Sequence, residues 1–178
     1  TSDANYDLAE EAMAFDRQIR ERVDHGHIPD LRCCGRCEWF KNNPWRDVAY
    51  ADMVFGEMVR QIRRAVVKYI KVSPVRILEV GCGPGHISLE LARHGFNVDG
   101  IDLSPVCIEV ANHFAAKCPF SDSRGTLRYW QADFLAFKPP HEYEVVIFVN
   151  SLHHFKNAHS VGRRAAEILT TNGIFYAN

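Results

Sequence analysis

The stretch Leu78-Glu79-Val80-Gly81-Cys82-Gly83-Pro84-Gly85 decides the fold. Residues 76–80 form a short apolar run that ends in glycines, which is typical of a buried parallel strand. Glycines at alternate positions permit a tight turn, and they let a ligand approach the main chain without intervening Cβ atoms. In an open α/β sheet such a loop lies at the carboxyl edge of the strands, where ligands bind. The stretch therefore predicts a strand, a ligand-binding loop and a helix.

Strand and helix signals alternate on the carboxyl-terminal side of this loop. Gly95 is placed to end the first helix, Ser104 and Pro105 to cap and begin the second, and Asn172-Gly173 to turn into the last strand. We expect an irregular or short helical segment between the third and fourth strands. The alternation predicts a doubly wound, mainly parallel Rossmann-like α/β sheet with right-handed crossovers. The expected strands are 76–80, 96–101, 126–131, 144–149 and 174–177, and the expected helices are 87–94, one from 105 onward, and 157–169.

The amino-terminal part has a different texture. Apolar residues recur every three or four positions over 8–23 and again over 48–70, so both stretches predict amphipathic helices. The connector 38–47 between them contains Pro44, which interrupts helix, and Asp47, which is a reasonable N-cap for the second helix. We therefore divide the chain into a helical extension or lid over 1–72 and a ligand-binding core over 73–178.

Composition indicates an ordinary folded domain and restricts its partners. The 178 residues are 47% hydrophobic and 24% charged, with a formal net charge of −1. A protein that holds nucleic acid by neutralising phosphates usually shows a basic excess, so we expect a small-molecule substrate and no nucleic acid. No apolar run approaches the length that spans a bilayer, and three of the six cysteines fall in the expected core, so we expect a cytoplasmic protein without a membrane partner. The oligomeric state stays open.

The spacing of the glycines argues against two common nucleotide loops. The dinucleotide pattern G-x-G-x-x-G would begin at Gly81 and Gly83, but His86 stands where its third glycine belongs, and the glycine comes one residue early at Gly85. The Gly-Lys-Ser/Thr ending of a phosphate-binding P-loop is also absent. The loop is therefore not optimised for pyrophosphate, which disfavours an oxidoreductase.

Two acidic residues follow the next two strands. Asp102 ends the second strand, where a carboxylate can accept hydrogen bonds from both ribose hydroxyls of an adenosine or, alternatively, favour the start of the next helix. Asp133 and Phe134 follow the third strand, where an acid and an aromatic ring can meet the adenine amino group and ring. Taken alone, Asp133 is equally explained as a loop acid.

Together, these features resemble class I S-adenosylmethionine-dependent methyltransferases of the small-molecule branch, similar to quinone and natural-product enzymes. The likeness runs from Arg76 onward, and the run LEVGCGPGHISLELARHGFNVDGIDLSP carries it. The resemblance implies S-adenosyl-L-methionine as cofactor, with its methionine end near Glu79 and Gly81, its ribose on Asp102 and its adenine near Leu103. The cofactor-binding residues that it implies are Glu79, Gly81, Cys82, Gly83, Gly85, Asp102, Leu103, Ala132, Asp133, Phe134 and Asn150.

The segment 149–155 is expected to lie beside the acceptor. Asn150 is followed by Ser-Leu-His rather than by the two prolines of amino-group methyltransferases that act on adenine or glutamine. The implied reaction is an SN2 transfer of a methyl group to a small molecule, which mainly requires alignment of donor and acceptor. His153 or His154 could act as the base for a hydroxyl acceptor, because the histidine pKa lies near neutrality. An equally good alternative is that one histidine caps the loop while the other packs on the next helix.

Other interpretations remain open for the amino-terminal residues. The connector side chains Trp39, Phe40, Trp45 and Arg46 could form a lid tip, or the aromatics could fasten the extension to the sheet. Cys33, Cys34 and Cys37 lack the second ligand pair of a usual zinc site, so we expect no metal; zinc there would favour an RNA-directed methyltransferase. A non-catalytic cofactor-binding or regulatory module is the alternative of a different class.

The resemblance also implies strands that the sequence does not contain. The resembled fold has seven strands, and the fifth is expected at 174–177, directly before Asn178. The exposed apolar edge that would result is an aggregation hazard. We therefore expect strands six and seven to be missing, and the sequence to be truncated or part of a longer chain.

Overall fold

A computed structural model describes residues 8–24, 48–118, 122 and 125–178. Two helices precede the sheet, and strands and helices then alternate as the sequence predicts. The elements are α1 (Leu8–Asp24), α2 (Val48–Tyr69), β1 (Arg76–Val80), α3 (His86–Arg93), β2 (Asn97–Asp102), α4 (Pro105–Lys117), β3 (Leu127–Gln131), β4 (Tyr143–Phe148), the short 3-10 turn η4 (Leu152–His154), α5 (Ala158–Ile168) and β5 (Leu169–Ala177).

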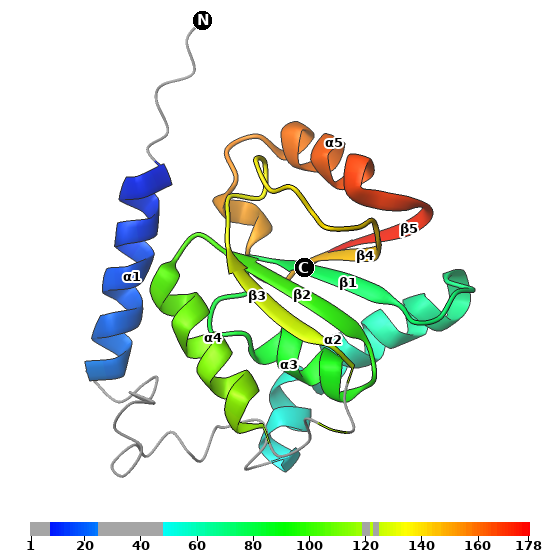
Figure 1. Cartoon of the computed structure of the whole chain (residues 1–178), viewed down its shortest axis with the longest axis horizontal. Coiled ribbons are helices and arrows are strands. Elements are labelled where there is room, and N and C mark those ends of the chain that lie inside the picture. Colours follow the sequence, from blue (N-terminus) through cyan, green and yellow to red (C-terminus); the bar gives the residue numbers. More distant parts are fainter. Residues whose placement is uncertain (1–7, 25–47, 119–121, 123–124) are drawn as a thin grey trace, which may run out of the picture.

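The five strands form one sheet in the order β3-β2-β1-β4-β5. Every neighbouring pair is parallel, including β1 with β2 and β1 with β4. The strand order reverses beside β1, so the loop after β1 opens at the switch point where open α/β sheets bind ligands. The structure confirms the predicted doubly wound parallel sheet (Figure 1).

Helices cover both faces of the sheet (Figure 1). On one face, α2 and α3 pack on β1 and β4 through buried residues such as Ile62, Leu91 and Ile77. On the other face, α5 packs on the same strands through Val161 and Leu78. Neighbouring residues 77 and 78 of β1 thus point to opposite faces, and both are fully buried, as expected for a central parallel strand. α1 lies against α4, where Ile19 enters a cluster with α3 and α4 side chains.

The predicted helix ends are present. Ser104 caps α4 by accepting a hydrogen bond from the Cys107 N–H, and Pro105 is the first helical residue. Gly95 directly follows His94, the C-cap residue of α3, and has a φ of +90°. This backbone conformation favours glycine. These local signals fix where the chain turns back toward the sheet.

The last helix and strand differ from the sequence prediction in their bounds. Helix α5 ends at Ile168, and β5 begins at Leu169, so the turn expected at Asn172-Gly173 is instead an irregularity within one strand. The pairing of β5 with β4 shifts register there, between Tyr143 and Val145. Residues 132–142 contain a turn and no helix, so the expected segment between the third and fourth strands is irregular rather than helical. Its apolar side chains Phe134 and Phe137 pack in the cluster on the α5 face.

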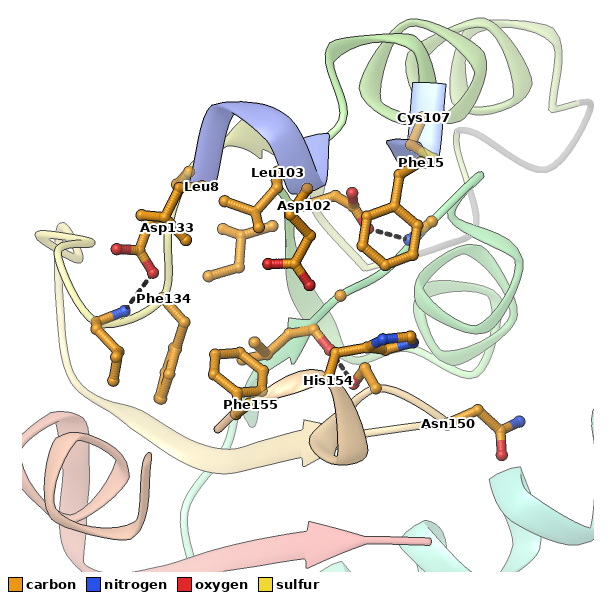
Figure 2. A pocket seen from close by; sticks show the side chains of 18 of the residues that line it. Leu8, Phe15, Asp102, Leu103, Cys107, Asp133, Phe134, Asn150, His154 and Phe155 are labelled. Carbon is orange, nitrogen blue, oxygen red and sulfur yellow. Dashed lines mark hydrogen bonds between the residues drawn. The ribbon is translucent and has the colours of Figure 1, made fainter. Parts of the chain in front are cut away.

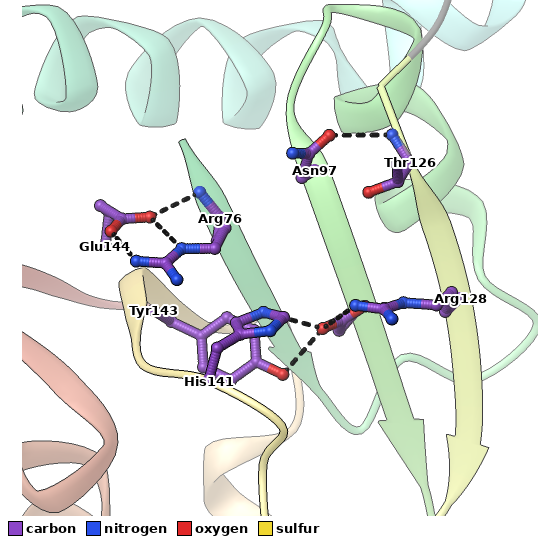
Figure 3. A network of polar contacts seen from close by, with 8 residues as sticks. Arg76, Asn97, Thr126, Arg128, His141, Tyr143 and Glu144 are labelled. Atoms are coloured by element: carbon purple, nitrogen blue, oxygen red, sulfur yellow. Dashed lines mark hydrogen bonds and ion pairs between the residues drawn. The ribbon is translucent and has the colours of Figure 1, made fainter. Parts of the chain in front are cut away.

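A polar network fastens the amino-terminal ends of the strands, opposite the glycine loop (Figure 3). The buried carboxylate of Asp99 accepts hydrogen bonds from Arg128 and from the hydroxyl of Tyr143, the latter at 2.8 Å, and His141 lies 3.4 Å away. Beside it, Arg76 and Glu144 form a bidentate pair between β1 and β4. The network thus gives the buried carboxylate of Asp99 several polar partners.

Some predictions fall on residues outside the described ranges. The connector with Trp39, Phe40, Trp45 and Arg46 is one, the N-cap at Asp47 is another, and the cysteines Cys33, Cys34 and Cys37 are a third. Among the helices that the structure describes, none combines the length and the apolar character needed to cross a bilayer.

Candidate cofactor site

A cavity of about 1030 Å³ opens at the carboxyl edge of the sheet. It is bounded by the glycine loop, by the ends of β2 and β3, by the segment after β4, and by α1 (Figure 2). Pockets for small ligands are typically about 300–1,000 Å³, so this cavity has room for a ligand of nucleoside size or larger. Nine of the residues that the sequence assigns to the site line it: Gly81, Gly83, Asp102, Leu103, Ala132, Asp133, Phe134, Asn150 and His154.

The floor of the cavity is the loop after β1. Gly81 has a φ of +70°, and a Cβ at this position would lie 2.6 Å from the Cβ of Ser151. Ser151 is held in place because its hydroxyl donates a 2.6 Å hydrogen bond to the carbonyl of Val80. Gly83 also has a positive φ, but a Cβ there would meet no atom within 4 Å. Gly81 is therefore required by packing, whereas Gly83 leaves open space on the side of the cavity.

Asp102 is hydrogen-bonded to this loop. One of its carboxylate oxygens accepts the Gly83 N–H at 2.8 Å, and the other accepts the Ser104 N–H at 2.9 Å. Burial raises the pKa of Asp102, and these two backbone hydrogen bonds act against that rise. Each carboxylate oxygen keeps acceptor capacity beyond one bond, and Figure 2 shows the group facing the cavity. It can therefore accept vicinal hydroxyls while its orientation is fixed.

The wall beyond Asp102 is apolar with one acid. Phe134 is buried against Phe148 and Phe155, with its ring at right angles to that of Phe148. Asp133 accepts the N–H of Leu135, which leaves its carboxylate at the rim of the cavity (Figure 2). This combination suits a flat heterocycle with an exocyclic amino group.

Helix α1 forms the opposite wall. Leu8, Glu11, Phe15, Gln18 and Ile19 all line the cavity, which places one face of α1 over the site. Burial raises the pKa of Glu11, Lys156 across the cavity lowers it, and Asp133 raises it further. The α1 side of the cavity is therefore partly apolar and carries one carboxylate.

The two histidines of the segment after β4 have different surroundings. His154 lines the cavity and meets the ring of Phe15 edge to face, with 5.1 Å between ring centroids (Figure 2). The rings of His153 and His154 lie 4.1 Å apart and are tilted by 39°, but His153 is not among the cavity residues. Burial, and secondarily the charge of His153, lower the pKa of His154, so its imidazole is neutral at pH 7. Asn150 has a φ of +52°, which is uncommon for a residue other than glycine.

Four predicted site residues do not line the cavity. Glu79 is buried beside the loop, where Ser88 donates a short hydrogen bond to it, and burial raises its pKa to about 8. Cys82 packs against Ala111 and Tyr129 behind the loop. Gly85 and His153 are the other two. These residues support the loop or lie beside the cavity rather than forming its wall.

The structure adds cavity residues that the sequence did not assign. Phe15 and Glu11 come from α1, Cys107 from the first turn of α4, and Phe155 and Lys156 from the segment after η4. Phe15 belongs to the predicted apolar stripe of residues 8–23. The sequence therefore predicted that it lies on the apolar face of a helix, but not that this face lines the cavity. Within the described part of the chain, no three His, Cys, Asp or Glu side chains cluster so as to hold a metal ion.

The fold and cavity define a doubly wound α/β domain with a ligand-sized cavity at the carboxyl edge of its sheet, and comparison with known proteins gives its family. Residues 77–173 match the family described as methyltransferase domain. This match covers more than half of the chain, from β1 to the middle of β5, and the chain belongs to this methyltransferase family.

Two curated relatives are ubiquinone biosynthesis O-methyltransferases. The protein of Rickettsia canadensis (strain McKiel) is 31% identical over 113 residues, which cover 64% of this chain and 46% of the relative. The protein of Nitrosospira multiformis is 30% identical over 111 residues, which cover 62% of this chain and 45% of the relative. The chain therefore spans about half the length of the curated relatives that it matches.

Solved structures share the fold at low sequence identity. The magnesium protoporphyrin IX methyltransferase ChlM of Synechocystis PCC 6803, solved with bound SAM, has a TM-score of 0.63 and 19% identity, over 95% of this chain and 74% of that one. The glycopeptide N-methyltransferase MtfA has a TM-score of 0.56 and 22% identity, over 66% of this chain and 51% of that one. Both likenesses support the arrangement of the sheet and its helices.

Proposed function

We propose that this domain binds S-adenosylmethionine and transfers its methyl group to a hydroxyl of a small aromatic molecule. The observation that supports the proposal most is the Asp102 carboxylate, which is aimed into the cavity and held by the Gly83 and Ser104 N–H groups. Family membership and the names of the curated relatives support the same reaction.

The cavity residues fit the cofactor. Asp102 would accept the two ribose hydroxyls, while Phe134 and Asp133 would cover the adenine ring and accept from its amino group. The open space above Gly83 would admit the chain that links ribose and methionine. When bound, the sulfonium supplies an electrophilic methyl group, and the acidic groups at Asp102, Asp133 and Glu11 suit its positive charge.

The chain's own residues would align the acceptor and remove its proton. Phe15 and His154 line the cavity on the side away from Asp133 (Figure 2), and an aromatic acceptor can pack there. A neutral imidazole nitrogen of His154 would take the proton from the acceptor hydroxyl, while the bound cofactor would supply the methyl group that replaces this proton on oxygen. We assign this role to His154 rather than His153, because only His154 lines the cavity.

Helix α1 would act as the lid of the site. One face of α1 lines the cavity, and Ile19 anchors the helix in the cluster formed with Leu89, Cys107 and Phe114. A helix in this position excludes water from the reacting groups. We propose that the extension 1–72 contributes to the site in this way, and that 73–178 is the cofactor-binding core.

Calorimetric titration tests the donor side. We expect S-adenosylhomocysteine to bind, NAD to bind far more weakly, and Asp102→Asn to weaken S-adenosylhomocysteine by about 10- to 100-fold, since hydrogen bonds to a charged group are lost. Glu109→Gln, an exposed change of the same charge on α4, is the matched control. Tight NAD binding without a response to S-adenosylhomocysteine would overturn the proposal.

Transfer of a labelled methyl group to a panel of phenols, aromatic amines and aromatic carboxylates tests the acceptor side. Label on phenols that disappears in Asp102→Asn supports the proposal. Binding of S-adenosylhomocysteine without label on any acceptor would favour the alternative of a non-catalytic cofactor-binding module.

A further inference from the structure

Ser104 lies between α1 and Asp102, and it forms hydrogen bonds to both. Its side chain is fully buried, although it is polar. Its hydroxyl oxygen accepts the Cys107 N–H at 3.0 Å and thereby caps α4. The same hydroxyl donates its hydrogen to the carboxylate of Asp16 on α1, in a short hydrogen bond. Its backbone N–H donates to Asp102.

These contacts form a continuous chain from α1 to the glycine loop. Asp16 accepts from Ser104, Ser104 donates its N–H to one oxygen of Asp102, and the other oxygen of Asp102 accepts the Gly83 N–H. The chain crosses from α1 through the start of α4 to the loop after β1. Asp16 itself does not line the cavity, so it acts on a ligand through Asp102, by the hydrogen bonds of Ser104 and by its own charge, which raises the pKa of Asp102.

We propose that Asp16 is a positioning residue that couples the docking of α1 to ligand binding at Asp102. This inference rests on the proposed function, because it assumes that Asp102 holds the ribose of the cofactor. When α1 is docked, Asp16 fixes the rotamer of the Ser104 side chain and, with it, the geometry of the N-cap that presents a backbone N–H to Asp102.

The reason for the coupling is the burial of Ser104. If α1 leaves, the Ser104 hydroxyl loses the acceptor of its single hydrogen, and the start of α4 has to rearrange or admit water to satisfy it. Either response loosens the Ser104 N–H that orients the Asp102 carboxylate. A ligand that requires this orientation favours docked α1 in return, because coupling between two sites is reciprocal.

A ligand in the cavity also contacts α1 directly, through residues such as Phe15 and Ile19, but these contacts do not depend on how Asp102 is oriented. Ile19 holds α1 against α3 and α4 whether or not Asp102 is correctly oriented. Phe15 and Leu8 line the cavity, but their side chains have no group that can form a hydrogen bond with Ser104 or Asp102. Asp16 is therefore the α1 residue whose contact depends on how the Asp102 carboxylate is oriented.

The test combines calorimetry with hydrogen–deuterium exchange of the α1 peptide. In the unmodified chain, S-adenosylhomocysteine should slow exchange of residues 8–24. In Asp16→Ala, we expect about three- to tenfold weaker binding and a smaller slowing of α1 exchange at saturating ligand, because only the direct contacts between ligand and α1 remain. In Asp16→Asn, an amide oxygen still accepts from Ser104, so binding and slowing should largely recover.

The controls separate the two proposals. Glu10→Ala, an exposed change on the same helix, should behave like the unmodified chain. If S-adenosylhomocysteine fails to bind the unmodified chain, the proposed function fails. If it binds the unmodified chain and Asp16→Ala equally, or slows α1 exchange equally in both, the proposed function stands and the role of Asp16 is overturned. A loss that Asp16→Asn does not rescue overturns that role as well.

Discussion

Tyr129 holds the last glycine of the cofactor loop, because its hydroxyl donates a 2.8 Å hydrogen bond to the carbonyl oxygen of Gly85. The two residues are 44 positions apart, in β3 and at the start of α3. Gly85 has a φ of +80°, and a Cβ there would lie 2.5 Å from that hydroxyl. The glycine is therefore required by the tyrosine as much as by its own backbone conformation.

This contact predicts a modest loss of stability in Tyr129→Phe. The phenyl ring should still fill the space beside Ala111, while the hydrogen bond to Gly85 is lost. We expect the free energy of unfolding in urea to fall by about 0.5–1.5 kcal/mol. Tyr69→Phe removes a hydroxyl from a side chain that is 55% exposed and should change it little. Equal effects of the two substitutions would contradict the role of the Gly85 contact.

Gly83→Ala should affect stability and ligand binding for two different reasons. Gly83 has a φ of +51°, so an alanine costs about 1–2 kcal/mol of stability. Its Cβ would meet no protein atom, and it would occupy space on the side of the cavity. We expect a folded variant that binds S-adenosylhomocysteine at least about tenfold more weakly, measured by calorimetry. Undiminished binding would show that the ligand does not approach Gly83.

The sequence predicted which residues gather at this edge of the sheet because local signals define their positions. Gly81 and Gly83 follow a recognisable strand, and Asp102 ends the next one. Parallel strands bring their carboxyl ends together, so residues at those ends line one cavity. The placement of Gly81, Asp102 and Asp133 thus followed from element boundaries alone.

Other parts depended on tertiary packing, which the sequence does not display. The stripe on α1 predicted a helix, but not that Phe15 would meet His154 over the cavity. The choice between His153 and His154 depends on the direction of a short 3-10 turn, which no periodicity reveals. Glu79 was expected against the ligand, yet its side chain turns to Ser88 on α3.

Glu79→Gln should alter how stability depends on pH. Burial raises the pKa of Glu79 to about 8, against an ordinary value of 4.5, so the folded chain holds a proton that the unfolded chain loses between these values. The native chain therefore loses stability as pH rises from about 4.5 to 8, by roughly 1.4 kcal/mol per pH unit at most. The amide variant lacks this loss, and its relative stability should grow over that window and level off above it.

Urea unfolding of the ligand-free chain at several pH values measures this effect. Glu109→Gln, which is exposed, should follow the native profile throughout. A constant difference between Glu79→Gln and the native chain from pH 5 to 8 would show that Glu79 is ionised in the folded state.

His154→Gln should change the pH profile of methyl transfer to a phenol. Burial lowers the pKa of His154, so the native rate should fall on the acid side only below about pH 6.5, where the imidazole becomes protonated. The glutamine variant should be about 100-fold slower or more and should lack this acid limb. His153→Gln should keep both the limb and most of the rate. A normal profile in His154→Gln would exclude its role as the base.

Tyr143→Phe tests the network at the opposite edge of the sheet. Tyr143 is fully buried, and its hydroxyl is 2.8 Å from the Asp99 carboxylate, which is itself only 4% exposed (Figure 3). Loss of a hydrogen bond to a buried charge should lower the free energy of unfolding by about 1.5–3 kcal/mol.

Arg128 contacts the same carboxylate, but its side chain is 51% exposed. Arg128→Gln should therefore cost less than about 1 kcal/mol. Because the network lies away from the cavity, Tyr143→Phe should bind S-adenosylhomocysteine normally at temperatures where it remains folded, and a selective loss of binding would show that this edge is coupled to the site.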